Sequence, residues 1–170
     1  TQYFVAGLRA LLRFCVVEGL MHLDLSQAAL PVTGRRRSPL PRGITPAEAR
    51  ALLESCDRRS ALGRRDYAIL MMLAKLGMRA DEVATLTLDD IDWRSGEMLV
   101  RAKGRQRARM PIPPDVGAAV VTYLRDGRPK SSCRRLFLRT LAPHVGFASG
   151  CALTMIAKTA LERAGIRGYA

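Results

Sequence analysis

The stretch Leu76–Trp93, LGMRADEVATLTLDDIDW, decides how the rest of the sequence is interpreted. A long apolar helix is predicted to stop at Gly77, and a second helix opens with Glu82 three residues after Arg79. Because the preceding helix is too apolar to lie on a surface, we expect the core to hold Arg79 in place rather than leave it in solvent. A fixed arginine at a helix junction is suited to bind a phosphate or a carboxylate.

The basic composition indicates a polyanionic partner. The 170 residues contain 28 Lys and Arg against 15 Asp and Glu, which gives a formal net charge of +13. Nucleic acid is the first candidate. An anionic membrane surface is the weaker candidate, because no predicted helix has a purely basic face. Most of the basic residues are Arg, whose planar fork favours specific phosphate contacts over mere solubility. The length fits one substantial core, or one domain with a piece of another attached.

The cysteines and histidines do not form a metal-binding pattern. No two of the four Cys stand in a C-x-x-C pair, and the chain has only two His. This argues against a zinc site, and neither a metal nor another cofactor is expected. Buried free thiols in a reducing compartment are the simpler interpretation. The sequence has no signal peptide and no run of about 18 apolar residues, so we predict a cytoplasmic protein without a membrane partner.

Three segments follow one another along the chain. Residues 1–30 show helical spacing of apolar residues, but one helix and a turn are too short to bury that stripe. Residues 31–44 are rich in Pro, Gly and Arg and are predicted to be an extended linker. Its basic run, Arg35, Arg36 and Arg37, fits contact with a phosphate backbone and simple solvation about equally well. Residues 45–170 form the main domain.

The main domain is predicted to be α+β, mainly helical, with a small three-stranded antiparallel sheet. Thr45 opens the first helix as its N-cap, with Pro46 and Glu48 at the favoured positions after it. The segment Asp66–Leu76 is apolar nearly all round and belongs at the centre of the domain. Further elements are expected as helices at 80–86, 115–125 and 149–164, a short apolar strand or turn at 136–138, and strands at 91–93, 97–102 and 107–112.

The order of these elements resembles that of the catalytic domain of the tyrosine recombinases, also called the phage integrase family. Three segments carry the resemblance: TPAEARALLES from Thr45, RRDYAILMMLAKLGMRADEVATLTLDDIDW from Arg64, and MLVRAKGRQRARMPIP from Met98. The resemblance covers Thr45 to about Gly165. Residues 1–30 resemble the end of the family's N-terminal helical DNA-clamping domain, also called the core-binding domain.

The resemblance implies roles for three residues. Arg79 would be the first catalytic arginine, whose guanidinium holds non-bridging oxygens of the scissile phosphate, and Glu82 would support it. Lys103 would protonate the leaving 5′ oxygen, although Ala102 stands where the family often has Gly. The residues alone favour a plain ion pair of Arg79 with Glu82 or Asp81, and they leave Lys103 open as an exposed turn lysine.

Further arginines surround Lys103 and form a basic ribbon suited to phosphate contacts: Arg101, Arg105, Arg107 and Arg109. Two aromatic residues receive structural interpretations. Trp93 is predicted to plug the back of the meander, and Tyr67 to lie in the core with its hydroxyl at the edge.

The family's later motifs are absent from this chain. In the family, a His-x-x-Arg motif, a later His or Trp and the nucleophilic Tyr follow the helix that ends here near Gly165, and Tyr169 falls too early to replace the nucleophile. We therefore expect a truncated recombinase that holds about two thirds of the catalytic domain and cannot cleave DNA alone. A covalent adduct on a suicide DNA substrate that disappears in Tyr169→Phe would contradict this expectation. The truncation is also expected to expose an apolar patch beside Asp66–Leu76.

The resemblance further implies the reaction and the partners. The reaction is strand cleavage by tyrosine attack on a phosphate, which gives a 3′-phosphotyrosyl link and a free 5′ hydroxyl, followed by ligation without metal or nucleotide. The expected partners are double-stranded DNA and other copies of the chain, since the family assembles as tetramers on DNA. Two alternatives stay open: a non-catalytic DNA-binding regulator or integrase remnant on the same scaffold, and a basic helical protein that binds RNA.

Overall fold

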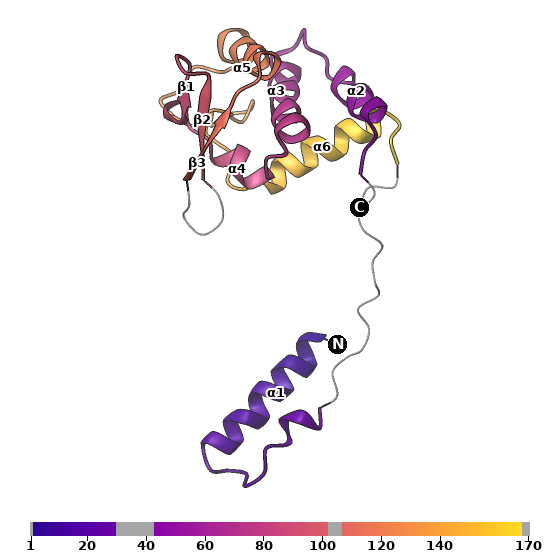
Figure 1. The fold of residues 1–170 in the computed structure, drawn as a ribbon, viewed down its shortest axis with the longest axis vertical. Coiled ribbons are helices and arrows are strands. Elements are labelled where there is room, and N and C mark those ends of the chain that lie inside the picture. Colours follow the sequence, from indigo (N-terminus) through magenta and orange to yellow (C-terminus); the bar gives the residue numbers. More distant parts are fainter. Residues whose placement is uncertain (1, 30–42, 102–106, 168–170) are drawn as a thin grey trace. The chain divides into compact units, whose positions relative to one another are not determined.

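The computed structural model describes residues 2–29, 43–101 and 107–167. The chain divides into two compact units, Thr1–Arg42 and Gly43–Ala170, and each has its own internal contacts (Figure 1). Within the described ranges, none of the helices is both long enough and apolar enough to cross a membrane.

The first unit consists of helix α1, Gln2–Val17, followed by a short 3-10 helix, η1, Leu25–Gln27. Arg9 ties the two together by donating a hydrogen bond of 2.8 Å to a backbone carbonyl just beyond η1. Apolar side chains along α1 stay exposed, with Phe4 at 73% and Leu11 at 56%. This is the outcome expected for a helix that has too few neighbours in its own unit to cover its apolar stripe. The assignment of this unit to a DNA-clamping domain remains a prediction.

Helix α3, Ala61–Leu76, is the centre of the second unit (Figure 1). It contacts the other helices of this unit: α2 (Pro46–Glu54), α4 (Ala80–Thr85), α5 (Pro114–Asp126) and α6 (Cys151–Arg163). Ile69 and Met72 of α3 have no exposed surface. The prediction of an apolar helix at the centre of the domain is therefore confirmed.

The start of α3 lies earlier than predicted, at Ala61 instead of Asp66. Ser60 caps the helix, because its hydroxyl oxygen accepts the amide of Gly63 at 3.0 Å. Gly63 is buried against the backbone carbonyl of Asp57, where a side chain would not fit. The first turn of α3 is thus fixed by polar and backbone contacts, which the periodicity of apolar residues does not report.

The sheet is an antiparallel meander with the strand order β1-β2-β3, as predicted. Its strands are β1 (Ile91–Asp92), β2 (Glu97–Arg101) and β3 (Arg107–Pro111). Met98 and Val100 of β2 are buried and belong to the main core. Since side chains alternate between the two faces of a strand, the other residues of β2 point away from the core.

Trp93 is 48% exposed, so the prediction that it plugs the back of the meander is wrong. The preceding strand ends at Asp92, whose carboxylate accepts hydrogen bonds from the amides of Arg94 and Ser95. These bonds begin a tight turn directly after the strand, and Trp93 lies in that turn rather than at an inward strand position. The hydrogen bonds, that from the Ser95 amide first, hold the pKa of the Asp92 carboxyl below its usual value.

The segment 136–138, predicted as a short apolar strand or turn, has no exposed surface. Leu138 forms an isolated antiparallel bridge with Gly146. The Leu138 amide donates to the hydroxyl of Tyr123 at 3.1 Å, and the Tyr123 ring stacks on Phe137. The segment therefore closes the core next to α5, and burial raises the pKa of Tyr123.

The capping box at the start of α2 is confirmed and predicts a stability change. The Thr45 hydroxyl accepts the Glu48 amide at 3.2 Å, and the Glu48 carboxylate accepts the Thr45 amide at 2.8 Å. We expect Thr45→Ala to lower the free energy of unfolding by about 1 kcal/mol, measured by urea denaturation. Thr122→Ala is the control, because the hydrogen bond that its hydroxyl makes among the described residues goes back within α5 to the Ala118 carbonyl. The prediction fails if the two variants are equally stable.

Candidate nucleic-acid interface

Arg79 lies at the junction between α3 and α4. Gly77 ends α3 in the left-handed conformation, at φ 62°, which glycine adopts without a steric cost. Met78 follows and is only 5% exposed, so it anchors the turn in the core. Arg79 is then the N-cap residue of α4. The predicted helix stop and restart around Arg79 are therefore both confirmed.

Glu82 binds Arg79 at two places. Its Oε2 accepts the backbone amide of Arg79 at 2.8 Å, and its Oε1 accepts a guanidinium N–H from Nη1 at 3.0 Å. Within the described parts of the chain, no other residue accepts a hydrogen bond from this guanidinium. Arginine has five N–H donors, so most of them stay available for another acceptor. Both carboxylate oxygens of Glu82, in contrast, accept hydrogen bonds from Arg79. Glu82 is therefore suited to hold Arg79 in place rather than to transfer a proton.

The expectation that the core holds Arg79 away from solvent is wrong. The Arg79 side chain is 71% exposed, whereas that of Glu82 is 13% exposed. The apolar core stops at Met78 and resumes at Val83, so Arg79 lies at the rim between them. The ion pair with Glu82 sets its position instead. This is the ion pair that the residues alone favoured, and it is also the contact that a supported phosphate ligand needs.

Three of the predicted DNA-binding arginines share the outer face of the meander. The register pairs Arg101 directly with Arg107, and Arg109 lies two residues further along β3. All three are exposed: Arg101 because the alternate residues of β2 take the inner face, and Arg107 and Arg109 because the first three residues of β3 are all exposed. The structure thus brings Arg101, Arg107 and Arg109 together on one side of a thin sheet. We call this set the sheet arginines.

The charges of the sheet arginines are only partly balanced. The Arg109 guanidinium is 3.1 Å from the Glu97 carboxylate, and that of Arg101 is 3.5 Å from Asp90. Arg107 makes no ion pair with any residue that the structure describes. Like charges directly opposite each other destabilise a sheet, and Arg101 and Arg107 are placed in this way. An anion such as a phosphate backbone would relieve this repulsion.

The other predicted site residues lie outside the described residues. They are Lys103 and Arg105, in the range 102–106, and Arg35, Arg36 and Arg37, in the range 30–42. Their roles as leaving-group acid and as phosphate contacts remain predictions.

Part of the arginine excess serves the fold rather than a ligand. Arg128 donates to three backbone carbonyls in the segment 133–136. Arg135 donates to the carbonyl of Thr85 at the end of α4. Arg65 is buried in an ion pair within α3. The inference that the arginine bias reflects phosphate contacts is therefore too broad, because these three arginines are used internally.

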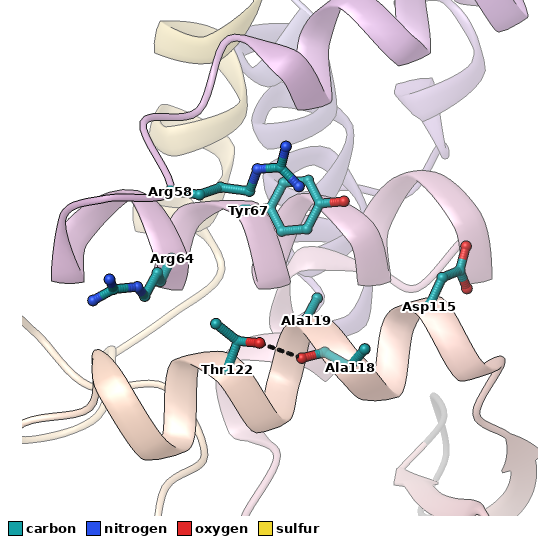
Figure 2. Close-up of a pocket in the computed structure, with 7 residues that line it drawn as sticks. All are labelled: Arg58, Arg64, Tyr67, Asp115, Ala118, Ala119 and Thr122. Carbon is teal, nitrogen blue, oxygen red and sulfur yellow. Dashed lines mark hydrogen bonds between the residues drawn. The ribbon is translucent and has the colours of Figure 1, made fainter.

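Tyr67 is only partly buried, and it lines a groove of about 480 Å³ between α3 and α5. Figure 2 shows the Arg58 guanidinium over the Tyr67 ring, at 4.9 Å from its centroid, while Arg64 and Asp115 lie toward opposite ends of the groove. The Asp115 carboxylate is paired with Lys75. None of the predicted site residues lines this groove, so it is separate from the candidate interface.

The cysteines remain free thiols in different surroundings. Cys56 is buried, and burial raises the pKa of its thiol, whereas Cys151 is exposed. The prediction of buried thiols is thus right for the first and wrong for the second. Over the ranges 2–29, 43–101 and 107–167, no group of three or more His, Cys, Asp and Glu residues could hold a metal ion.

Comparison with known proteins places this fold in a family. The family model described as "Phage integrase family" matches residues 42–168, a range that includes every helix and strand of the second unit. The chain belongs to the phage integrase family. This confirms the resemblance that was drawn from the three sequence segments.

The relatives within the phage integrase family are longer than this chain. A putative integrase/recombinase of Sinorhizobium fredii, y4rA, is 42% identical over 160 residues, which are 94% of this chain and 39% of that protein. The tyrosine recombinase XerD of Mycobacterium tuberculosis is 35% identical over 169 residues, and the match covers 94% of this chain and 53% of XerD. The chain therefore spans about half the length of these relatives, or less.

A solved structure confirms the fold class. The crystal structure of a lambda integrase dimer bound to a COC′ core site matches 99% of this chain and 59% of that chain, with a TM-score of 0.73 and 11% identity. At this identity the likeness concerns the fold alone, which is mainly helical with a small antiparallel sheet.

Proposed function

We propose that this phage integrase family chain is the DNA-binding part of a site-specific tyrosine recombinase, and that Arg79 contacts the phosphate at which a strand is cut. The observation that carries the proposal is the double contact of Glu82 with Arg79, which orients an exposed guanidinium and leaves most of its donors available. Family membership supplies the reaction class.

The chemistry of phosphoryl transfer explains why such an arginine is useful. When a nucleophile attacks a phosphodiester, negative charge increases on the non-bridging oxygens. A guanidinium can donate two parallel hydrogen bonds to such oxygens, and its charge does not depend on pH near neutrality. Glu82 fixes the backbone and one edge of Arg79 before DNA arrives, so less side-chain entropy is lost on binding.

The sheet arginines fit contacts to the DNA backbone away from the cleaved phosphate. Their exposed and partly unbalanced charges favour a polyanion, and phosphate contacts of this kind position a protein on a duplex without reading its sequence. Self-association on DNA is a further part of the proposal. It is motivated by the lambda integrase structure, which is a dimer on its core site, and it is not required for the contacts of one chain.

The experiment compares Arg79→Ala with Arg125→Ala in binding to a duplex, followed by fluorescence anisotropy at several salt concentrations. The two arginines are matched, since their side chains are 71% and 74% exposed and each pairs with one carboxylate. We expect Arg79→Ala to weaken binding by about tenfold at 0.1 M salt and to reduce the salt slope by about 0.9, the effect of one phosphate contact. Arg125→Ala should change both by much less.

Equal effects of the two variants would show that only net charge matters, and would contradict the role of Arg79. Repeating the titration with duplex RNA of the same length tests the RNA-binding alternative. Tighter binding to DNA than to RNA would exclude that alternative.

A protein that carries this chain together with the family's nucleophilic tyrosine tests the chemistry. There, Arg79→Ala should slow adduct formation on a suicide substrate by about 10²–10³-fold, and Arg125→Ala should not.

A further inference from the structure

Two helix starts meet beside Arg79. The amide of Gly150, the N-cap residue of α6, donates to the Asp81 carboxylate of α4 at 2.6 Å. A glycine has no side chain to cap its own helix, and the Ser149 hydroxyl accepts the next amide, that of Cys151, at 3.4 Å. The first amides of a helix need acceptors from outside the helix. Asp81 therefore supplies the acceptor for the Gly150 amide from a position far away in the sequence, beside the local contact of Ser149 with Cys151.

The two backbones are in direct contact at this point. A Cβ atom placed on Gly150 would lie 2.5 Å from the Asp81 nitrogen and 2.7 Å from the carbonyl carbon of Ala80. Gly150 has an ordinary helical φ of −66°, so its conformation does not require glycine. The requirement is steric: only a residue without a side chain lets α4 approach the start of α6 so closely.

The contact matters because α4 is short. It has six residues, and a helix of this length is not stable by its own hydrogen bonds. The first of these bonds joins the Val83 amide to the Arg79 carbonyl at 3.1 Å. Helix α6, in contrast, is longer and is anchored in the core by Leu153, which has no exposed surface. A link to α6 can therefore hold the start of α4 against a rigid element.

We propose that Asp81 is a positioning residue for Arg79. Asp81 clamps the start of α4 to α6 and so fixes the backbone from which the Arg79 guanidinium projects. The two carboxylates of the first turn of α4 then have different roles. Glu82 holds the Arg79 side chain and amide, and Asp81 holds the helix that carries them. The inference rests on the proposed function only for its consequence in DNA binding. The clamp itself is a property of the fold.

Hydrogen exchange followed by NMR tests the clamp without DNA. In Asp81→Ala, the Gly150 amide loses its acceptor, and the Val83 amide should exchange about 10- to 100-fold faster, the effect of losing a charged hydrogen bond. The Gly117 amide is the internal reference, because it donates to the Pro113 carbonyl in the first turn of α5 at 2.9 Å. Its exchange should not change. Unchanged exchange at Val83 would overturn the proposal.

Two further variants address folding. Asp81→Asn keeps an oxygen acceptor at the same place and should restore most of the protection at Val83. Gly150→Ala disturbs the same contact from the other helix and should make the Val83 amide exchange faster. Asp126→Ala removes one exposed carboxylate elsewhere and should leave Val83 unaffected. If Asp81→Ala does not fold, the other two variants decide. Faster exchange of the Val83 amide in Gly150→Ala, with unchanged exchange in Asp81→Asn, supports the clamp. Any other pattern overturns it.

A double-mutant cycle tests whether Asp81 acts through Arg79. Asp81→Ala should weaken DNA binding by about 3- to 10-fold in the wild-type background, within the range of coupling between neighbouring residues, and by less than about twofold in the Arg79→Ala background. The same factor in both backgrounds would mean a merely structural role and would overturn the proposal. If Arg79→Ala alone leaves binding unchanged, the proposed function fails, and the Val83 exchange alone then supports or overturns the clamp.

Discussion

Arg65→Met should lower the free energy of unfolding by about 3–5 kcal/mol, because it removes one partner of a buried ion pair and leaves the other uncompensated. Arg65 and Asp66 are each 8% exposed, and their side chains are 2.8 Å apart. The guanidinium also donates to the Thr140 hydroxyl at 2.7 Å and lies over the Phe147 ring at 5.2 Å. Arg65 thus connects the start of α3 to the segment that follows the buried strand-like residues 136–138.

The measurement is urea denaturation followed by circular dichroism, with two comparisons. Arg64→Met changes the neighbouring residue, which is partly buried and, among the described residues, donates to the Asp126 backbone carbonyl. It should cost about 1 kcal/mol or less, because it leaves no buried charge unpaired. The double variant Arg65→Met/Asp66→Leu removes both charges and should be more stable than Arg65→Met alone, since no unpaired charge remains in the interior. A double variant that is less stable than the single one would contradict the explanation.

Local chemistry was sufficient to predict much of the second unit from the sequence. Two features depend on residues that are close in sequence: the capping box of Thr45 and Glu48, and the glycine at the end of α3. They can therefore be predicted without knowing which elements pack against them. The meander was likewise predictable, because turns and alternating side chains mark its strands within about twenty residues of each other. The order of the elements then led to the family, which the comparisons confirm.

The features that the sequence did not predict have two physical causes: contacts with distant parts of the chain, and local polar contacts that the spacing of apolar residues does not report. Arg79 was expected in the core because the helix before it is apolar, but whether a residue lies inside or at the rim depends on where the packing elements end. Trp93 was expected to be inward, although the turn at Asp92 interrupts the strand. The contact of Asp81 with Gly150 joins two helix starts far apart in sequence, and no spacing pattern indicates it.

The largest effect on DNA binding is expected when all three sheet arginines are changed together. The triple variant Arg101→Ala/Arg107→Ala/Arg109→Ala should reduce the slope of log affinity against log salt by about 2.7, which is 0.9 for each lost phosphate contact. At 0.1 M salt this corresponds to a loss of affinity of about 10²–10³-fold. The fold should not suffer, because the three side chains are exposed and the change removes the repulsion between Arg101 and Arg107.

A second triple variant separates a defined surface from net charge. Arg59→Ala/Arg125→Ala/Arg163→Ala also removes three exposed arginines, but from outside the sheet. If the +13 net charge alone attracts DNA, both triple variants should lower the affinity and the salt slope equally. If the outer face of the meander lies along the phosphate backbone, only the sheet variant should flatten the slope, because counterions are released where phosphates are contacted. The slope is the decisive measurement, since it counts contacts independently of any change in stability.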